Sequence, residues 1–145
     1  MHPKLEPLIQ SEVKKILDAR IIFKARHSEW VSNLVSVRKK SREIRLCADF
    51  RNLNRTSDKD NYPIPPMEHI LQMVSGFELF SLLDGFLGYN QVLVVEEDRI
   101  KTRFRTRWGT FSYRRMPFGL INAGATFQRA MDIDFHGLVG RSVVV

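Results

Sequence analysis

Asp84 is the first residue whose type and setting suggest chemistry. It ends the run Glu78 to Asp84, which is rich in apolar residues, and Gly85 follows it. The run predicts a buried strand that stops at the Asp-Gly pair. A carboxylate held at the end of a buried strand can bind a hard cation such as Mg²⁺. An isolated Asp-Gly pair more often only begins a turn, so a turn is the competing interpretation.

Basic residues suggest a second kind of chemistry. Lysine and arginine total 23 against 16 aspartate and glutamate residues, for a net charge of +7. The cations fall mainly in two groups, Arg38 to Arg45 and Arg99 to Arg115. A positive balance of this kind favours a nucleic-acid partner, although basic proteins without one are common.

The second basic group contains five cations at every other position: Arg99, Lys101, Arg103, Arg105 and Arg107. In a strand, this two-residue period would place all five on one face. Like charges on one face repel unless phosphate or carboxylate lies opposite. The segment therefore predicts either a track for a nucleic-acid backbone or a solvated edge strand whose charges discourage aggregation, and we weigh the two equally.

The chain has 145 residues, 43% of them hydrophobic, which suits one ordinary domain. No apolar run approaches the roughly 18 residues that span a bilayer, and Met1 to Lys4 lacks the start of a signal peptide. We therefore expect an intracellular protein, cytoplasmic or nuclear rather than secreted, with no membrane partner. The single Cys47 cannot form an internal disulfide, and we interpret it as a small core residue.

The elements that must position these residues alternate between helix and strand. Residues 8–17 have helical apolar spacing after Pro7, and residues 33–37 and 43–50 predict a hairpin with the basic tip Lys39 to Arg42. The proline-rich residues 57–66 predict a linker, and Met67 to Val74 a helix with Gly76 as a left-handed cap.

The second half of the chain adds further predicted elements. Strands are expected at 91–95, 103–106 and 110–116, and a helix from Asn122 to near Gly137, with Phe127, Ala130, Met131 and Phe135 on one face. Residues 141–145 resemble the start of another strand. These patterns together predict an α+β fold.

Five ordered sequence blocks point to a family. They are Ile44 to Asn54 (IRLCADFRNLN), Asp60 to Pro65 (DNYPIP), Leu83 to Gln91 (LDGFLGYNQ), Met116 to Leu120 (MPFGL) and Asn122 to Arg129 (NAGATFQR). In this order they resemble the reverse transcriptases of gypsy-like long-terminal-repeat retrotransposons. The resemblance covers nearly the whole chain.

The resemblance implies a right-hand polymerase fold limited to fingers and a partial palm, with antiparallel strands and packed helices. It implies that residues 1–58 and 92–122 belong to the fingers, and residues 59–91 and 123–145 to the palm. The expected activity of the parent enzyme is RNA-directed DNA polymerisation. Its partners would be an RNA or DNA template-primer and deoxynucleotides, and its cofactor Mg²⁺.

The same resemblance implies a role for each matching residue. Asp84 matches the first metal-binding aspartate, which would hold Mg²⁺ for nucleotidyl transfer. Arg45 and either Lys39 or Lys40 match cations that grip the triphosphate. Tyr89 matches the bulky residue beneath the incoming sugar, where a ring would clash with a ribose 2′-hydroxyl.

Two further positions belong to the nucleotide site that the resemblance implies. Phe118 stands where retroviral enzymes carry a glutamine, and a phenyl ring there can pack but cannot hydrogen-bond. Gly119 would allow the backbone to approach a ligand closely. Lys101 fits the family pattern, whereas Arg103, Arg105 and Arg107 replace residues that are usually small or neutral.

The family places a Tyr-x-Asp-Asp motif directly after a strand that matches Ser142 to Val145, where this chain stops. We therefore expect a polymerase fragment that is inactive alone, because one carboxylate cannot offset two mutually repelling dications. The alternative is a non-catalytic, basic nucleic-acid-binding remnant of a decayed element. A third expectation is a chain too incomplete to fold stably.

Overall fold

The computed structural model describes residues 5–26, 30–38, 44–82 and 88–145. Within them a five-stranded sheet has the order β1-β5-β4-β2-β3. Its strands are β1 Ile22–Lys24, β2 Ser32–Arg38, β3 Ile44–Ala48, β4 Phe104–Thr106 and β5 Gly109–Tyr113. The β2 and β4 pair is parallel, and the other neighbours are antiparallel. The sheet thus joins segments from the predicted residues 1–58 and 92–122, while the predicted domain boundaries themselves stay a prediction.

The predicted hairpin is confirmed by the pairing of β2 with β3. Leu34 lies opposite Ala48, and Val37 lies opposite Arg45. Strand β3 is at the edge of the sheet, so Arg45 is carried on an edge strand. The predicted basic tip, with Lys39 and Lys40, lies outside the described residues.

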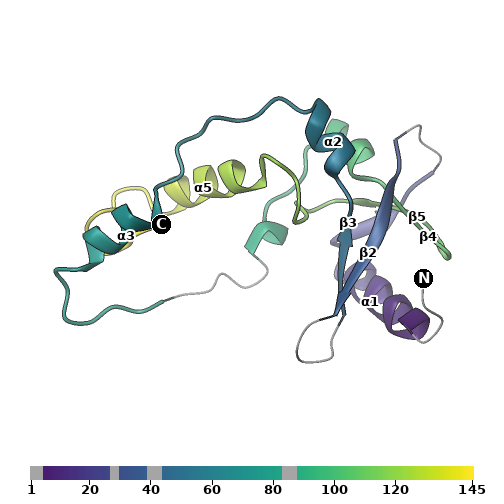
Figure 1. Cartoon of the computed structure of the whole chain (residues 1–145), viewed down its shortest axis with the longest axis horizontal. Helices are drawn as coiled ribbons and strands as arrows, with labels where there is room; N and C mark the ends of the chain where they lie inside the picture. The colour runs from purple at the N-terminus through teal and green to yellow at the C-terminus, as the bar shows by residue number, and fades with distance from the viewer. Residues whose placement is uncertain (1–4, 27–29, 39–43, 83–87) are drawn as a thin grey trace.

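The main core lies between the sheet and helix α1, Glu6–Asp18. The helix begins with Pro7 in its first turn, as predicted, and buries Ile9 and Val13. Phe104 from β4 is fully buried in the same core, and its ring stacks on that of Phe111 at 5.8 Å between centroids. Figure 1 shows the sheet and α1 toward one end of the molecule.

The remaining helices are α2 Arg51–Thr56, α3 Met67–Val74, α4 Glu96–Arg99 and α5 Ala123–Asp134, and 3-10 turns occupy Gly88–Gln91 (η2) and Ile100–Thr102 (η3). Figure 1 places α3, α5 and the C-terminus away from the sheet. Residues 57–66 have no regular structure, so the predicted linker is confirmed. Gly76 does not have the predicted left-handed conformation. Helix α3 ends at Val74, and its C-cap residue Ser75 has ordinary helical angles.

Several predicted strands are wrong. The described part of the predicted Glu78–Asp84 strand, residues 78–82, is not a strand, and Leu79 and Leu82 are 89% and 90% exposed. Residues 91–95 and 141–145 form only isolated bridges, Leu93 with Arg115 and Val143 with Val139. A single bridge cannot stabilise a strand, because pairing needs a ladder of several residues.

The predicted strand geometry across Arg99 to Arg107 is also wrong. Residues 96–102 form α4 and then η3, and only Phe104–Thr106 is strand. Three acidic residues at the start of α4 favour a helix N-terminus. Buried Thr102 then holds the turn, since its hydroxyl donates to the Arg99 carbonyl and accepts from the Tyr113 amide. In the described part of the chain, no helix is both long and apolar enough to cross a bilayer.

Candidate nucleotide site

Arg45, Phe118 and Tyr89 come together in one cluster, although they lie far apart in the sequence. The Arg45 guanidinium lies 5.4 Å from the centre of the Phe118 ring. The Phe118 ring also contacts the Tyr89 ring, with 5.1 Å between the two ring centroids. Arg45 is exposed and forms no ion pair within the described part of the chain. The cluster therefore presents an exposed positive charge, unpaired among the described residues, next to a half-exposed aromatic surface.

Tyr89 is held from two directions. Its short 3-10 turn, η2, begins at Gly88, which has a positive φ of 30°. The Tyr89 ring packs against Phe118 and, at 5.3 Å between centroids, against the edge of Phe127 from α5. Such aromatic pairs are worth about 0.5–1.5 kcal/mol beyond the area they bury. The predicted helix face containing Phe127 thus supports a candidate site residue rather than the main core.

The backbone conformation at position 119 favours glycine. Its φ is +94°, and a β-carbon there would meet Phe50 at 3.7 Å, which is ordinary contact. The Asn54 side chain from α2 fixes this turn by donating to the Gly119 carbonyl at 2.8 Å and accepting from the Ile121 amide at 2.9 Å. Sequence reasoning missed this function of Asn54, which is typical of a side chain that bonds to backbone brought close only by the fold.

A cavity of about 250 Å³ opens beside the cluster, between α1, β3 and the segment of Phe118. Arg45 and Phe118 line it together with Asn90, the neighbour of Tyr89. The Asn90 Oδ1 atom is buried without a hydrogen-bond partner among the described residues. A buried polar atom of this kind normally accepts a hydrogen bond, so the cavity wall contains an acceptor that the described residues leave unused.

Three other predicted site residues, Lys39, Lys40 and Asp84, lie outside the described residues. Among the residues that are described, no group of three or more histidine, cysteine, aspartate or glutamate side chains is placed to hold a metal ion. Asp84 therefore stays a predicted Mg²⁺ ligand.

The five alternating cations do not share one face. Lys101 pairs with Asp98 at 2.7 Å, Arg107 pairs with Glu6, and Arg99 donates to the Val94 carbonyl at 3.0 Å. Arg103 is partly buried and donates to the Ser112 hydroxyl at 3.3 Å. Arg105 is exposed and has no ion pair in the described ranges. The geometric argument for a continuous track is thus wrong, and nucleic-acid binding by the individual cations stays a prediction.

A polar groove that the sequence did not indicate lies at the start of α2. It has a volume of about 510 Å³, and its lining includes Asp49, Arg51 and Arg55. Arg51 donates to both oxygens of Asp49, and these hydrogen bonds lower the pKa of the Asp49 carboxyl to about 2. Arg55 is exposed and has no ion pair with a described residue, so it adds an exposed positive charge to the groove.

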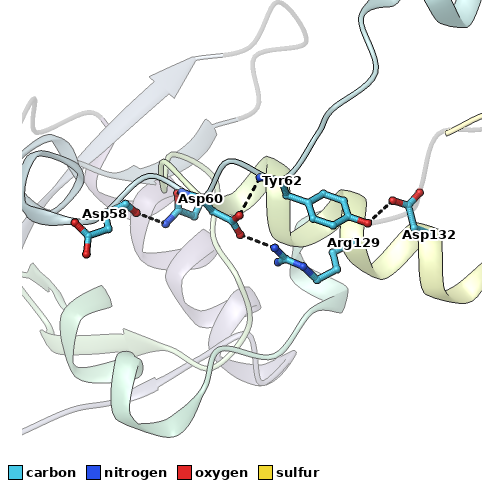
Figure 2. A network of polar contacts seen from close by, with 6 residues as sticks. Asp58, Asp60, Tyr62, Arg129 and Asp132 are labelled. Atoms are coloured by element: carbon cyan, nitrogen blue, oxygen red, sulfur yellow. Dashed lines mark hydrogen bonds and ion pairs between the residues drawn. The ribbon is translucent and has the colours of Figure 1, made fainter.

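A polar network attaches the linker to helix α5, as Figure 2 shows. Arg129 donates to Asp60 at 2.8 Å, and the Tyr62 hydroxyl donates to Asp132 at 2.6 Å. The Arg129 guanidinium also lies 4.4 Å from the centre of the Tyr62 ring. These contacts lower the pKa of Asp60, through the Arg129 hydrogen bond, and raise the pKa of Tyr62, through the Asp132 hydrogen bond.

Comparison with known families agrees with the sequence motifs. The family described as "Reverse transcriptase (RNA-dependent DNA polymerase)" matches residues 37–143, a range that contains Arg45, Tyr89, Phe118 and Gly119. The chain belongs to the reverse transcriptase family. It is a portion of such a domain of the retrotransposon kind, as the motifs predicted.

Two curated relatives illustrate this membership. The chain is 37% identical to the "Retrovirus-related Pol polyprotein from transposon gypsy" of Drosophila melanogaster, over 92% of this chain and 13% of that protein. It is 38% identical to an "RNA-directed DNA polymerase homolog" of Oenothera berteroana, over 70% of this chain and 72% of that protein. The chain thus spans only about an eighth of the gypsy polyprotein.

A solved structure shows the same fold. The foamy viral protease-reverse transcriptase, determined in complex with an RNA/DNA hybrid, superposes with a TM-score of 0.81 at 20% identity. That similarity covers 100% of this chain and 19% of the other. The predicted α+β fold, part of a polymerase fold, is confirmed.

Proposed function

We propose that this chain is the part of an RNA-directed DNA polymerase that receives the incoming deoxynucleotide. The observation that carries the proposal is the meeting of Arg45, Phe118 and Tyr89 in one exposed cluster. Each of the three belongs to a different sequence block, so the cluster is a product of the fold. Its mixture of one cation and two rings suits a ligand with a charged end and a flat, partly apolar body.

Arg45 would bind the triphosphate. A guanidinium makes short, charge-assisted hydrogen bonds to phosphate oxygens, and such bonds are about twice as strong as neutral ones. The Phe118 ring holds the guanidinium from one side while leaving the charge exposed. Stacking on a ring reduces the freedom of the long side chain, so less conformational entropy is lost when phosphate binds.

Tyr89 and Phe118 would form the surface against the sugar. The two rings are in contact, and Phe127 supports Tyr89 from α5. A rigid ring beneath the sugar leaves no room for a 2′-hydroxyl, which would select deoxynucleotides. The left-handed turn at Gly119 would bring the backbone close to the same ligand.

Asp84, Lys39 and Lys40 are further residues of the proposed site, and their assignment rests on the sequence alone. Asp84 would hold Mg²⁺. When bound, this ion would lower the pKa of the primer hydroxyl and stabilise the negative charge of the leaving pyrophosphate. Lys39 or Lys40 would add a second cation to the triphosphate. The boundaries of fingers and palm, at residues 58, 91 and 122, belong to the same proposal.

A template-primer is the second proposed partner. Solved reverse transcriptases of similar fold are described with an RNA/DNA hybrid and with double-stranded DNA. Arg55 in the polar groove and Arg105 on β4 are exposed cations without ion pairs in the described part of the chain. An RNA or DNA duplex would be held by such cations through its phosphates. The proposed compartment is the cytoplasm or the nucleus, where template and deoxynucleotides occur.

Calorimetric titration of the chain with a deoxynucleoside triphosphate tests the nucleotide site. We expect saturable binding that Arg45→Gln weakens about tenfold, the loss of one charged hydrogen-bonding group. Arg55→Gln is the matched control, since it removes the same charge from an exposed position outside the cluster. Equal affinities of wild type and both variants would refute the assignment of Arg45.

A non-catalytic nucleic-acid-binding chain is the second candidate function. Exposed Arg55 and Arg105, which have no ion pair with another described residue, favour it. Affinity for a primer-template should fall linearly with salt in log-log form, with a slope of about 0.9 per phosphate contact on duplex DNA. Salt-dependent duplex binding without any nucleotide binding would support this candidate over the first. Absence of both kinds of binding would reject both.

A further inference from the structure

The attachment of the linker to α5 has a consequence for Tyr89. Asn122, immediately before α5, fixes the first part of the linker, since its side chain accepts from the Asp60 amide at 2.9 Å and donates to the Asp58 carbonyl at 2.8 Å. One amide side chain thus satisfies two backbone groups of a segment without regular structure. The linker cannot slide along the helix without losing both bonds.

The next contacts form the polar network of Asp60, Tyr62, Arg129 and Asp132 seen in Figure 2. Asp60 accepts from Arg129 at 2.8 Å and from the Tyr62 amide at 3.0 Å, so one carboxylate joins the helix to the linker. Arg129 and Asp132 are three positions apart on α5 and therefore share a face. The Tyr62 ring lies against that face, under Arg129 and bonded to Asp132.

The linker then brings the partly exposed Ile64 near the point where Tyr89 approaches α5. A β-carbon on Gly124 would lie 3.5 Å from the Cδ1 atom of Ile64 and 3.9 Å from the Tyr89 hydroxyl. Ile64 and Tyr89 therefore approach α5 at the same point, and a β-carbon on residue 124 would make ordinary contact with both. Pro63 and Pro65 flank Ile64 and restrict the backbone there.

We infer that the polar network is a positioning device for Tyr89, in which Asp60, Tyr62, Arg129 and Asp132 hold the linker so that Ile64 and Gly124 limit the movement of the Tyr89 ring. This inference rests on the proposed function where it concerns the sugar. The four network residues lie outside the proposed nucleotide site and act through Ile64 and α5. Loosening the network should let the Tyr89 ring move, and discrimination between deoxy- and ribonucleotides should fall.

Tyrosine labelling can test the position of Tyr89 without a nucleotide. The chain has three tyrosines, Tyr62, Tyr89 and Tyr113, so fluorotyrosine incorporation gives three ¹⁹F signals. The variant Tyr62→Phe keeps the ring under Arg129, removes the hydroxyl bond to Asp132 and leaves only two signals. We expect the Tyr89 signal to shift or broaden, while the signal of buried Tyr113 stays in place.

Two further variants make the test specific. Asp132→Asn should move the Tyr89 signal, whereas Asp134→Asn, on the same helix and without a side-chain partner among the described residues, should not. A Tyr89 signal unchanged in both Tyr62→Phe and Asp132→Asn would overturn the inference. Movement of the Tyr113 signal together with that of Tyr89 would also overturn it, because the network would then support the whole fold.

The effect of the network on nucleotide selection is measured in a separate binding experiment. The ratio of deoxy- to ribonucleotide affinity should fall about threefold to tenfold in Asp132→Asn, the range of coupling between neighbouring groups, and should not change in Asp134→Asn. An unchanged ratio would refute the link to sugar selection. If the wild type binds no nucleotide, the proposed function fails, while the ¹⁹F signals still decide whether the network positions Tyr89.

Discussion

The guanidinium of Arg45, on edge strand β3, lies 5.4 Å from the centre of the Phe118 ring, in the loop that follows β5. This cation-ring contact is worth about 0.5–1 kcal/mol at an exposed site. Its larger consequence is geometric, since Phe118 also contacts Tyr89. One ring thus connects the candidate phosphate ligand to the candidate sugar-selecting residue.

Replacement of Phe118 should impair binding more than stability. Phe118 is 46% exposed, so Phe118→Ala removes less buried area than the loss of a core ring would, but Arg45 and Tyr89 lose the ring between them. We expect deoxynucleotide affinity to fall about threefold to tenfold, in line with coupling between contacting groups. Phe80→Ala is the matched control, because Phe80 is 56% exposed and outside the cluster. Equal nucleotide affinity in the two variants would argue against the connecting role of Phe118.

Gly119→Ala should destabilise the chain through its backbone. The φ of +94° is strained for any residue with a β-carbon, and left-handed conformations cost about 1–2 kcal/mol. Gly76→Ala, which has an ordinary φ and open space around it, should change the free energy of unfolding little. Urea denaturation of both variants measures the difference. Equal stability of the two variants would show that the turn at Gly119 is not constrained as described.

The two lowered aspartate pKa values predict acid sensitivity. Because the pKa of Asp60 is lower in the folded chain, its contribution to stability is fully present above the unfolded value of about 3.9 and is lost as pH falls through the folded value. Asp49, with a pKa of about 2, acts in the same direction. Stability should therefore decline from about pH 4 to about pH 2.

Asp60→Asn isolates the part of this effect that comes from the linker network. The variant should be less stable than wild type at neutral pH and should lose less stability on acidification. Asp58→Asn is the control, because only the backbone carbonyl of Asp58 bonds to Asn122. Thermal unfolding between pH 2 and pH 7 measures both. An acid response of Asp60→Asn identical to that of wild type would contradict the pKa assignment.

The 145-residue chain alone should not extend a primer. Its sequence contains no Tyr-x-Asp-Asp motif, and one predicted carboxylate, Asp84, cannot hold two dications against their repulsion. Gel analysis of a labelled primer with template, deoxynucleotides and Mg²⁺ measures this directly. Mg²⁺-dependent extension that Asp84→Asn abolishes would contradict the prediction.

The sequence predicted the parts of the fold that local patterns determine. Helix α1, the β2–β3 hairpin, the proline-rich linker and α3 follow from apolar spacing, alternation and proline content. The prediction for Arg99 to Arg107 was wrong, because it relied on alternating charge. A strand is indicated by alternating burial, which charge alone does not show. The conformation of this segment depends on Thr102, whose hydroxyl bonds to the distant Tyr113 amide.

The site shows the same division. Motif resemblance predicted Arg45, Tyr89, Phe118 and Gly119 as site residues, and the fold brings Arg45 and Tyr89 into contact with Phe118. The supporting residues were not predictable in this way. Asn54, Asn122 and Arg129 bond to groups more than sixty positions away, and no local pattern encodes such pairings.

The most direct test of the nucleotide site is to locate the sugar on the protein by NMR. Transferred nuclear Overhauser effects from the sugar protons of a deoxynucleoside triphosphate should reach the ring protons of Tyr89 and Phe118. In Phe118→Ala the effects to residue 118 should be lost, whereas in Phe80→Ala the effects to both Tyr89 and Phe118 should persist. Effects only to residues outside the Arg45, Phe118 and Tyr89 cluster, or none in the presence of saturable binding, would contradict the central claim.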